Sequence, residues 1–330
     1  MPTNRPRVLV TGATGFIGHP LCHYLLEQGW FVRAVGRSPK FEITNPHLEY
    51  CTIENIGENT NWDPLLEGID AIIHLAARVH HVKARKMHSL ALYQETNVKG
   101  TQQLAKAAIR CNVKRFIYIS SIKVNGEKTI TMPFRAEDQP HPQDAYALSK
   151  LQAEQILQEE SRRSGLEWVI IRPPLVYGPH VKGNFNRLMQ LAKTFIPLPF
   201  LNIKNSRSLL SVYNLCSFIE CCAKHPCARG EVFLVSDNQD VSTPQLIRLL
   251  REHRQFRSWL FPFPVSLLKL IGSLTGKRME IDRMVDSLQV NIEKTERLLS
   301  WKPPFSLEAS VQKLSAQPIE KLKSSIFRQA

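Results

Sequence analysis

Residues 8–18 read Val8-Leu9-Val10-Thr11-Gly12-Ala13-Thr14-Gly15-Phe16-Ile17-Gly18, an apolar run that leads into three glycines spaced Gly-x-x-Gly-x-x-Gly. A helical pattern follows directly. In a strand, turn and helix of this kind, Gly12 permits a tight turn, Gly15 lets the backbone approach a pyrophosphate, and Gly18 lets the helix lie close to the strand. The helix N-terminus adds N–H groups and a partial positive charge. This stretch therefore predicts a turn that binds the pyrophosphate of a dinucleotide.

Outward from this turn, the first half of the chain alternates short apolar runs with helical patterns. Such alternation is typical of βαβ units and a parallel sheet. The expected strands are 7–10, 31–35, 48–52, 71–75, 116–120 and 169–171. The expected helices are 16–28, 93–111 and 146–164. We expect an α/β fold, a Rossmann-type doubly wound parallel sheet with a smaller C-terminal substrate lobe.

The character of the chain changes after Pro174, where prolines become denser and the expected elements shorter. We expect a dinucleotide-binding domain over 1–172 and a mainly substrate-binding lobe over 173–330, with some segments returning to the first domain. The apolar stretch 259–274 is compatible with a helix lying at a membrane interface. Packing against the second lobe is the interpretation we favour.

Composition limits the classes of protein that this chain can represent. Of its 330 residues 43% are apolar, enough for a sizeable core, and the formal net charge is +14. The basic residues are spread along the chain without an aromatic-basic recognition motif, so we expect an anionic small substrate and no nucleic acid. No apolar run reaches the ~20 residues of a membrane span, and no secretory leader is evident, so we expect a cytoplasmic protein. Seven cysteines without a Cys-x-x-Cys pair predict no metal site.

The end of the second expected strand bears on the cofactor. In NAD-binding proteins this strand commonly ends in an acid that accepts the ribose hydroxyls. Here it ends in Arg37 and Ser38. A guanidinium can form two hydrogen bonds to a 2′-phosphate, so these residues favour NADP(H), with NAD(H) possible.

A second constellation is suited to proton transfer. Tyr146 and Lys150 are four residues apart at the start of an expected helix and share one face. A neighbouring ammonium favours the phenolate and so makes a tyrosine a better acid-base group. Ser120 and Ser121 follow the strand 116–120, and ligands of open parallel sheets bind beyond such carboxyl ends.

Together these motifs resemble the extended short-chain dehydrogenase/reductase family, which includes nucleotide-sugar epimerases, dehydratases and reductases. The resemblance covers nearly the whole chain. The motifs that carry it are Thr11 to Gly18, His74-Leu75-Ala76-Ala77, Asn97-Val98-Lys99-Gly100-Thr101, Ser120-Ser121, Tyr146 with Lys150, and Arg172 to Pro179.

The resemblance implies a role for each matching residue. Ser121, Tyr146 and Lys150 are expected to be catalytic. The expected cofactor-binding residues are Gly12, Thr14, Gly15, Phe16, Ile17, Gly18, Arg37, Ser38, Leu75, Ala76, Ala77, Asn97, Ser120, Tyr146, Lys150 and Pro173. The expected substrate-binding residues are Ser121, Asn184, Phe185, Arg207 and Arg283.

The family contains several activities. Its 4,6-dehydratases have an Asp-Glu pair after the catalytic Ser or Thr, where this chain has Ile122 and Lys123. The resemblance therefore argues against dehydration. The runs 120–127 and 172–185 are similar to those of bacterial reductases of UDP-2-acetamido-2,6-dideoxy-hexos-4-ulose, which make UDP-N-acetylquinovosamine for surface polysaccharide such as O-antigen.

We accordingly expect an oxidoreductase that acts on C4 of a UDP-sugar, first as a ketoreductase. A UDP-hexose 4-epimerase with tightly bound NAD is the alternative. A non-catalytic, dinucleotide-sensing regulator is a remote third, since such proteins typically lose the Tyr/Lys pair. The resemblance also implies a homodimer formed through the helices 94–111 and 146–164.

Overall fold

The computed structural model describes residues 5–39, 41–79, 86–192, 194–252 and 259–315. Its centre is a seven-stranded sheet in the order β3-β2-β1-β4-β5-β6-β9, with every neighbouring pair parallel. The strands are β1 (Arg7–Thr11), β2 (Phe31–Gly36), β3 (Leu48–Thr52), β4 (Ala71–His74), β5 (Arg115–Ile119), β6 (Glu167–Arg172) and β9 (Glu231–Leu234). The expected doubly wound parallel sheet is thus confirmed.

The order of the strands in the sheet indicates where a ligand crevice would lie. The chain adds β2 and β3 on one side of β1, then β4, β5 and β6 on the other. In open α/β sheets the crevice lies beyond the carboxyl ends of the strands at such a reversal. Thr11 at the end of β1 is in register with Val35 of β2 and His74 of β4. The residues that follow these strands therefore meet along one edge.

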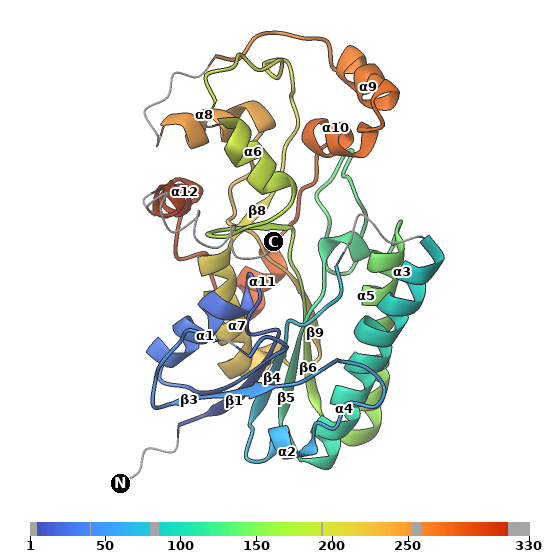
Figure 1. Ribbon diagram of the computed structural model, residues 1–330, viewed down its shortest axis with the longest axis vertical. Coiled ribbons are helices and arrows are strands. Elements are labelled where there is room, and N and C mark those ends of the chain that lie inside the picture. Colours follow the sequence, from blue (N-terminus) through green and yellow to red (C-terminus); the bar gives the residue numbers. More distant parts are fainter. Residues whose placement is uncertain (1–4, 40, 80–85, 193, 253–258, 316–330) are drawn as a thin grey trace.

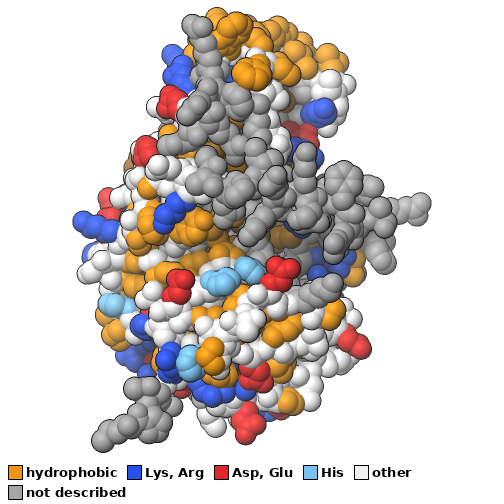
Figure 2. Space-filling model, turned by 60° about the vertical axis from the view of Figure 1, so that its left-hand side comes forward, with side chains coloured by type: hydrophobic (Ala, Val, Ile, Leu, Met, Phe, Trp, Pro, Cys, Tyr) orange, Lys and Arg blue, Asp and Glu red, His pale blue; other side chains and the backbone are white. Residues whose placement is uncertain are grey.

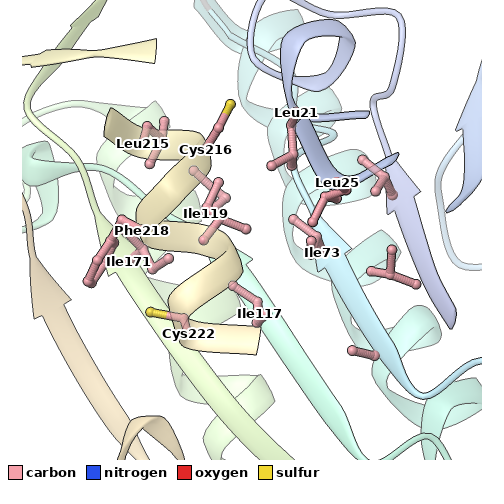
Figure 3. Close-up of a cluster of buried hydrophobic side chains, with 14 of the residues drawn as sticks. Leu21, Leu25, Ile73, Ile117, Ile119, Ile171, Leu215, Cys216, Phe218 and Cys222 are labelled. Carbon is pink, nitrogen blue, oxygen red and sulfur yellow. The ribbon is translucent and has the colours of Figure 1, made fainter. Parts of the chain in front are cut away.

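Helices cover both faces of the sheet (Figure 1). One face is covered by α1 (Gly18–Glu27) and α7 (Val212–Lys224), and the other by α2 (Asp63–Leu66), α4 (Gly100–Arg110) and α5 (Ala145–Ser164). Figure 3 shows the core on the first face, where Leu215 and Phe218 of α7 approach strand residues such as Ile117 and Ile119. Alternate strand residues, including Phe116 and Tyr118, pack on the other face. Because both faces are covered, the strands are almost continuously apolar.

The helix expected over 93–111 is longer and less regular than the sequence predicts. An α-helix, α3 (Lys86–Tyr93), continues into a π-helical segment, η1 (Gln94–Lys99), before α4 begins at Gly100. A Cβ at Gly100 would lie 2.6 Å from Ile56 Cγ2, so this turn packs closely against the preceding loop. π-Helical turns are frequent at functional sites, and this one contains Asn97. Helix α1 also differs from the expectation, since it begins at Gly18, two residues later than expected.

The second half of the chain builds the smaller layer above the sheet in Figure 1. It includes the parallel pair β7 (Leu175–Tyr177) and β8 (Leu209–Ser211) and the helices α6 (Asn184–Ala192), α8 (Thr243–Glu252), α9 (Val265–Leu274), α10 (Arg278–Val285) and α12 (Leu307–Ser315). Segments α7, β9 and α11 (Glu293–Leu299) return to the sheet, since β9 pairs with β6 and α7 packs on α1. None of the described helices has the length and apolar character needed to cross a bilayer.

Candidate active site

The turn after β1 has no room for a side chain at Gly12 or Gly18. Gly12 has a φ of +70°, and a Cβ there would lie 2.9 Å from the backbone nitrogen of Ala76. A Cβ on Gly18 would lie 2.2 Å from the carbonyl oxygen of Gly12. Glycine at these two positions therefore brings the loop after β4 and the start of α1 against the same turn.

The N-terminus of α1 fits an anionic group. Its N-cap residue, Ile17, makes no side-chain capping hydrogen bond within the described chain, and the first turn contains no acidic residue. Thr14 and Gly15, in the turn before it, are exposed. A helix start without a side-chain cap has N–H groups and a partial positive charge to offer to a phosphate. The glycine turn and the start of α1, together called the cradle, therefore fit the pyrophosphate of a dinucleotide.

The end of β2 lies beside this cradle. A Cβ on Gly36 would lie 2.9 Å from Thr14 Cγ2, so the strand passes close to the turn. Arg37 follows and is exposed, and the carbonyl of Ser38 accepts a hydrogen bond from the Tyr50 hydroxyl. The position commonly held by an acid in NAD-binding sheets thus carries a cation.

A buried histidine fixes the end of β4. Thr101 Oγ1 donates to the Asn97 carbonyl (2.7 Å), so it accepts from His74 Nε2 (3.2 Å). His74 Nδ1 then accepts from Thr11 Oγ1 (2.6 Å), which in turn accepts from the Ala76 backbone nitrogen (3.2 Å). Burial, with the Lys150 charge nearby, lowers the pKa of His74 to about 3. The ring is therefore neutral and holds the loop of Leu75, Ala76 and Ala77 against β1.

Asn97, in the π-helical turn, joins this loop to α5. Its Oδ1 accepts from the Arg78 backbone nitrogen (2.8 Å), and its Nδ2 donates to the Arg78 carbonyl (3.1 Å) and to Ser149 Oγ (3.0 Å). Ser149 Oγ donates to the Tyr146 carbonyl (2.7 Å). The wider π turn thus ties the first turn of α5 to the end of β4.

Ser121, Tyr146 and Lys150 gather at the carboxyl end of β5. Asp144 caps α5 by accepting from the Ala147 nitrogen (2.7 Å), which places Tyr146 in the first turn. The Tyr146 phenol is hydrogen-bonded to the Ser121 side chain. Lys150 is buried, donates from Nζ to the Ile119 carbonyl (2.7 Å), and lies 4.5 Å from the centre of the Tyr118 ring.

The electrostatics of this group are set mainly by burial. Burial raises the pKa of Tyr146, the charge of Asp144 and the Tyr93 phenol raise it further, and the Ser121 hydrogen bond lowers it. Burial lowers the pKa of Lys150 to about 7, against the opposing charge of Glu154. Tyr146 is accordingly a protonated donor at neutral pH, and Lys150 titrates near neutrality.

Ser120 has an unused hydrogen-bonding group. Its Oγ is buried and has no partner among the described residues. Its backbone nitrogen donates to the Ile171 carbonyl (2.8 Å), and the Ile122 nitrogen donates to the Pro173 carbonyl (3.0 Å). A buried hydroxyl without a partner indicates a place for a ligand or water. It lies at the strand end where the sequence predicts cofactor contacts.

A basic residue occupies the place of the dehydratase acid. Lys123 Nζ pairs with Glu127 Oε1 (2.7 Å) and with Asp144 Oδ2 (2.6 Å). Positions 122 and 123 therefore offer no carboxylate, and the ammonium offsets the Asp144 charge near Tyr146.

The expected substrate residues other than Ser121 lie in the smaller layer above the sheet, called the upper layer from here on. Arg207 is partly buried, with Nη1 donating to the Asp286 carbonyl (2.9 Å), and burial lowers its pKa, with the Arg283 charge a lesser contribution in the same direction. Arg283 is exposed on α10. Phe185 is 2% exposed and its ring stacks on Tyr177, so this residue packs in the core of the upper layer. The side chain of Asn184, the first residue of α6, lies outside the described residues.

Sequence reasoning missed the polar layer beneath the catalytic group. Arg172 pairs with Glu154 (2.6 Å) and donates from Nη1 to Asn125 Oδ1 (3.0 Å), all of them buried. Glu154 lies four residues after Lys150, so the helical spacing was the available signal. Nothing in the sequence indicated that Arg172 of β6 would be the partner of Glu154, because this contact depends on how α5 packs on the sheet.

Comparison with known proteins identifies the family to which this chain belongs. Residues 8–235 match the model of the NAD dependent epimerase/dehydratase family. The chain belongs to this family. Its members are enzymes, and the expected family assignment is confirmed. The match begins at β1 and ends just after β9, so it spans the whole central sheet.

Individual relatives agree with the family assignment. The chain is 43% identical over 304 residues to a UDP-glucose 4-epimerase of Vibrio cholerae, covering 91% of this chain and 92% of the relative. It is 27% identical over 287 residues to an N-acetyl-alpha-D-glucosaminyl-diphospho-ditrans,octacis-undecaprenol 4-epimerase of Escherichia coli O157:H7, covering 83% and 82%. A UDP-glucuronic acid 4-epimerase of Bacillus cereus, solved in complex with NAD, has the same fold, with a TM-score of 0.75, 22% identity and 97% and 99% coverage.

Proposed function

We propose that this enzyme oxidises or reduces C4 of a UDP-sugar, using Ser121, Tyr146 and Lys150. The observation that carries the proposal is the hydrogen bond between the Tyr146 phenol and Ser121, with Lys150 one helical turn further along the same helix. Three features support a nicotinamide dinucleotide across the carboxyl ends of the strands: the start of α1, the Arg37 end of β2, and the Ser120 hydroxyl, which has no partner among the described residues.

The residues divide the chemistry between them. A bound nicotinamide supplies or accepts the hydride at the sugar carbon. Ser121 holds the reacting sugar oxygen by a hydrogen bond. Tyr146 gives that oxygen a proton during reduction and takes one during oxidation, and the Lys150 ammonium stabilises the phenolate that remains.

Epimerisation is the first candidate within this chemistry. The 43% identical relative from Vibrio cholerae is a UDP-glucose 4-epimerase, and the alignment covers over nine-tenths of both chains. An epimerase oxidises C4, turns the ketone over and returns the same hydride. It needs no acid and base for loss of water, which agrees with Ile122 and Lys123 after Ser121.

Reduction of a 4-keto sugar is the second candidate. The specific observation in its favour is Arg37, an exposed cation at the end of β2 where an acid would select NAD. NADP(H) fits this residue, while NAD(H) agrees with the family. In this version the product would be a UDP-N-acetylquinovosamine-like sugar for surface polysaccharide.

One experiment separates the two versions. The purified enzyme is given UDP-glucose or UDP-N-acetylglucosamine without added cofactor, and UDP-4-keto-6-deoxy-N-acetylglucosamine with NADPH or NADH. An epimerase interconverts the gluco and galacto sugars and carries bound NAD. A reductase consumes reduced cofactor with the keto sugar alone. Failure of every substrate with each cofactor would reject the proposal.

Other parts of the expected enzyme remain proposals. We assign the nucleotide diphosphate to the upper layer, where Arg207 and Arg283 are close enough for their charges to interact. Two guanidinium groups suit a diphosphate. A homodimer through α4 and α5 stays a prediction, to be checked by analytical ultracentrifugation.

A further inference from the structure

Helix α9 is apolar on two opposite faces. Its inward face carries the buried Leu268 and Gly272, and a Cβ on Gly272 would lie 2.8 Å from Ile281 Cγ1 of α10. The outward face carries Leu267, Leu270, Ile271 and Leu274, which are 41%, 53%, 44% and 79% exposed. Their i, i+3, i+4, i+7 spacing forms one stripe along the helix. In a water-exposed helix this face would ordinarily be polar.

Neighbouring segments extend this stripe. Residues 196–201 run beside 259–261, with the Leu198 nitrogen donating to the Trp259 carbonyl and the Phe261 nitrogen donating to the Leu198 carbonyl, both at 3.0 Å. The second segment leads directly into α9. We call the exposed apolar side chains of these segments and α9 the apolar tip, which comprises Ile196, Leu201, Trp259, Phe261, Leu267, Leu270, Ile271 and Leu274. Figure 2 shows hydrophobic side chains gathered at the upper end of the molecule, where Figure 1 places α9.

The charges around the apolar tip are unevenly matched. Both acids of α10, and Asp286 just after it, are paired with cations. Glu280 pairs with Arg187 (3.0 Å). Asp282 pairs with Lys269 and Arg278 (3.7 Å each), and Asp286 pairs with Lys269 (3.0 Å). Lys204, Lys277 and Arg283 are exposed and form no ion pair within the described part of the chain. Among the described residues of α9, α10 and the turn between them, the charges without an ion pair are therefore positive, while Glu252 at the end of α8 is an exposed acid without one.

We propose that the apolar tip docks the protein on an anionic lipid surface, with α9 lying in the plane of the interface. A helix with aliphatic residues on one face and cations at its border binds at the boundary between headgroups and acyl chains. Trp259 and Phe261 add the amphipathic or aromatic side chains that favour this depth. The proposal does not depend on the sugar chemistry proposed above.

A lipid surface accounts for this pattern of apolar side chains and charges better than a second copy of the chain does. Two copies that met through this face would bring Lys204, Lys277 and Arg283 of each toward like charges. The formal net charge of +14 on each copy would add to the repulsion. Anionic headgroups instead attract these cations, while the stripe leaves water for the acyl boundary.

The test is sedimentation of the full chain with lipid vesicles. We expect binding to vesicles of phosphatidylcholine with one third phosphatidylglycerol, and weak binding to phosphatidylcholine alone. Raising the salt from about 0.1 M to about 1 M should weaken the binding, because the Debye length falls from about 10 Å to about 3 Å. Lys277→Gln should lower the partition coefficient about fivefold, the effect of one cation near an anionic surface.

Two exposed leucines provide the decisive variant. Leu270→Glu combined with Leu274→Glu should lower the partition coefficient by at least tenfold, since two apolar side chains become anionic. Both side chains are exposed, so the fold should be unaffected. Ile130→Glu is the matched control, because Ile130 is 88% exposed and lies outside the apolar tip. This control should bind as the unsubstituted chain does.

Trp259 gives an independent spectroscopic readout. It is 54% exposed, while Trp30, Trp62 and Trp301 are buried. Anionic vesicles should shift the tryptophan emission to the blue, and Trp259→Phe should abolish most of this shift.

Three results would overturn the proposal. The unsubstituted chain could fail to sediment with anionic vesicles, or the double glutamate variant could sediment equally well. In a third case the double variant changes the sedimentation coefficient of the protein in solution without any vesicle binding, which would make the apolar tip an interface between copies. Turnover of UDP-sugars in solution is measured in parallel, so failure of the proposed function is seen separately.

Discussion

Both carboxylate oxygens of Glu154 accept hydrogen bonds from the guanidinium of Arg172, at 3.0 Å from Nε and 2.6 Å from Nη2. The two side chains join α5 to β6 and are 2% and 5% exposed. Glu154 lies one turn beyond Lys150 and opposes the lowering of its pKa by burial. The pair thus positions the helix that carries Tyr146 and contributes to the charge state of Lys150.

Breaking this pair should cost more than breaking one at the surface. Glu154→Gln leaves a buried guanidinium without its counter-charge and should destabilise the protein by about 3–5 kcal/mol. Glu159→Gln is the matched control, because Glu159 pairs with Arg163 on the exposed side of the same helix and should cost at most about 0.5 kcal/mol. Denaturant unfolding measures both. Equal costs would show that the buried pair has no special role.

The same substitution should change the pH dependence of activity. Without the Glu154 charge the pKa of Lys150 falls further, so the ammonium is lost at a lower pH. The alkaline limb of the kcat profile should then move to lower pH in Glu154→Gln and stay in place in Glu159→Gln. A purely structural role for Glu154 would lower kcat evenly across the profile.

His74 makes the stability of the protein sensitive to acid. Burial lowers its pKa from 6.5 to about 3, so the unfolded chain binds the proton more readily between these values. Stability from His74 is complete above pH 6.5 and falls as the pH drops toward 3. At pH 5 the loss should be about 2 kcal/mol, from roughly 1.5 pKa units at about 1.36 kcal/mol each.

His74→Gln isolates this contribution. Glutamine cannot be protonated, so the difference between the unfolding free energies at pH 7.5 and pH 5 should be about 2 kcal/mol smaller in the variant. An unchanged difference would mean that His74 takes up its proton in the folded state. Comparison within each protein removes the cost of the substitution itself.

Arg37 should discriminate between the two cofactors. Arg37→Asp replaces a cation with a group that repels a 2′-phosphate and accepts ribose hydroxyls. We expect the Kd for NADPH to rise at least about tenfold relative to that for NADH, a change of about 1.4 kcal/mol. Isothermal titration with both cofactors measures it. Equal changes in both constants would make Arg37 a surface residue without a role in selection.

Local signals predicted much of the fold and the site. The glycine spacing, the apolar strands and the four-residue separation of Tyr146 and Lys150 are all properties of adjacent sequence. They sufficed for the sheet and its crevice edge, and they named Ser121, Tyr146 and Lys150, which the fold brings together and whose catalytic role stays a prediction. The Phe185 ring shows a limit of motif matching, since its place in the chain resembles a substrate contact while its side chain packs against Tyr177.

Contacts distant in sequence could not be predicted in the same way. The π-helical turn at Asn97 depends on partners at Arg78 and Ser149, which lie 19 and 52 residues away. The pairing of Glu154 with Arg172 depends on how α5 packs on β6. For the apolar stretch 259–274 the sequence favoured packing against the second lobe over a membrane interface, because composition does not reveal which face of α9 has a neighbour.

The catalytic account is tested most directly by isotope transfer. A UDP-sugar deuterated at C4, or the 4-keto sugar with deuterated reduced cofactor, is incubated with the purified enzyme, and mass spectrometry and NMR locate the label. The account predicts deuterium at C4 of the product. It also predicts that Tyr146→Phe lowers the rate of transfer by about 100-fold or more, while Tyr24→Phe, outside the site, leaves it unchanged. Label at another carbon, or transfer by Tyr146→Phe at the unsubstituted rate, would contradict it.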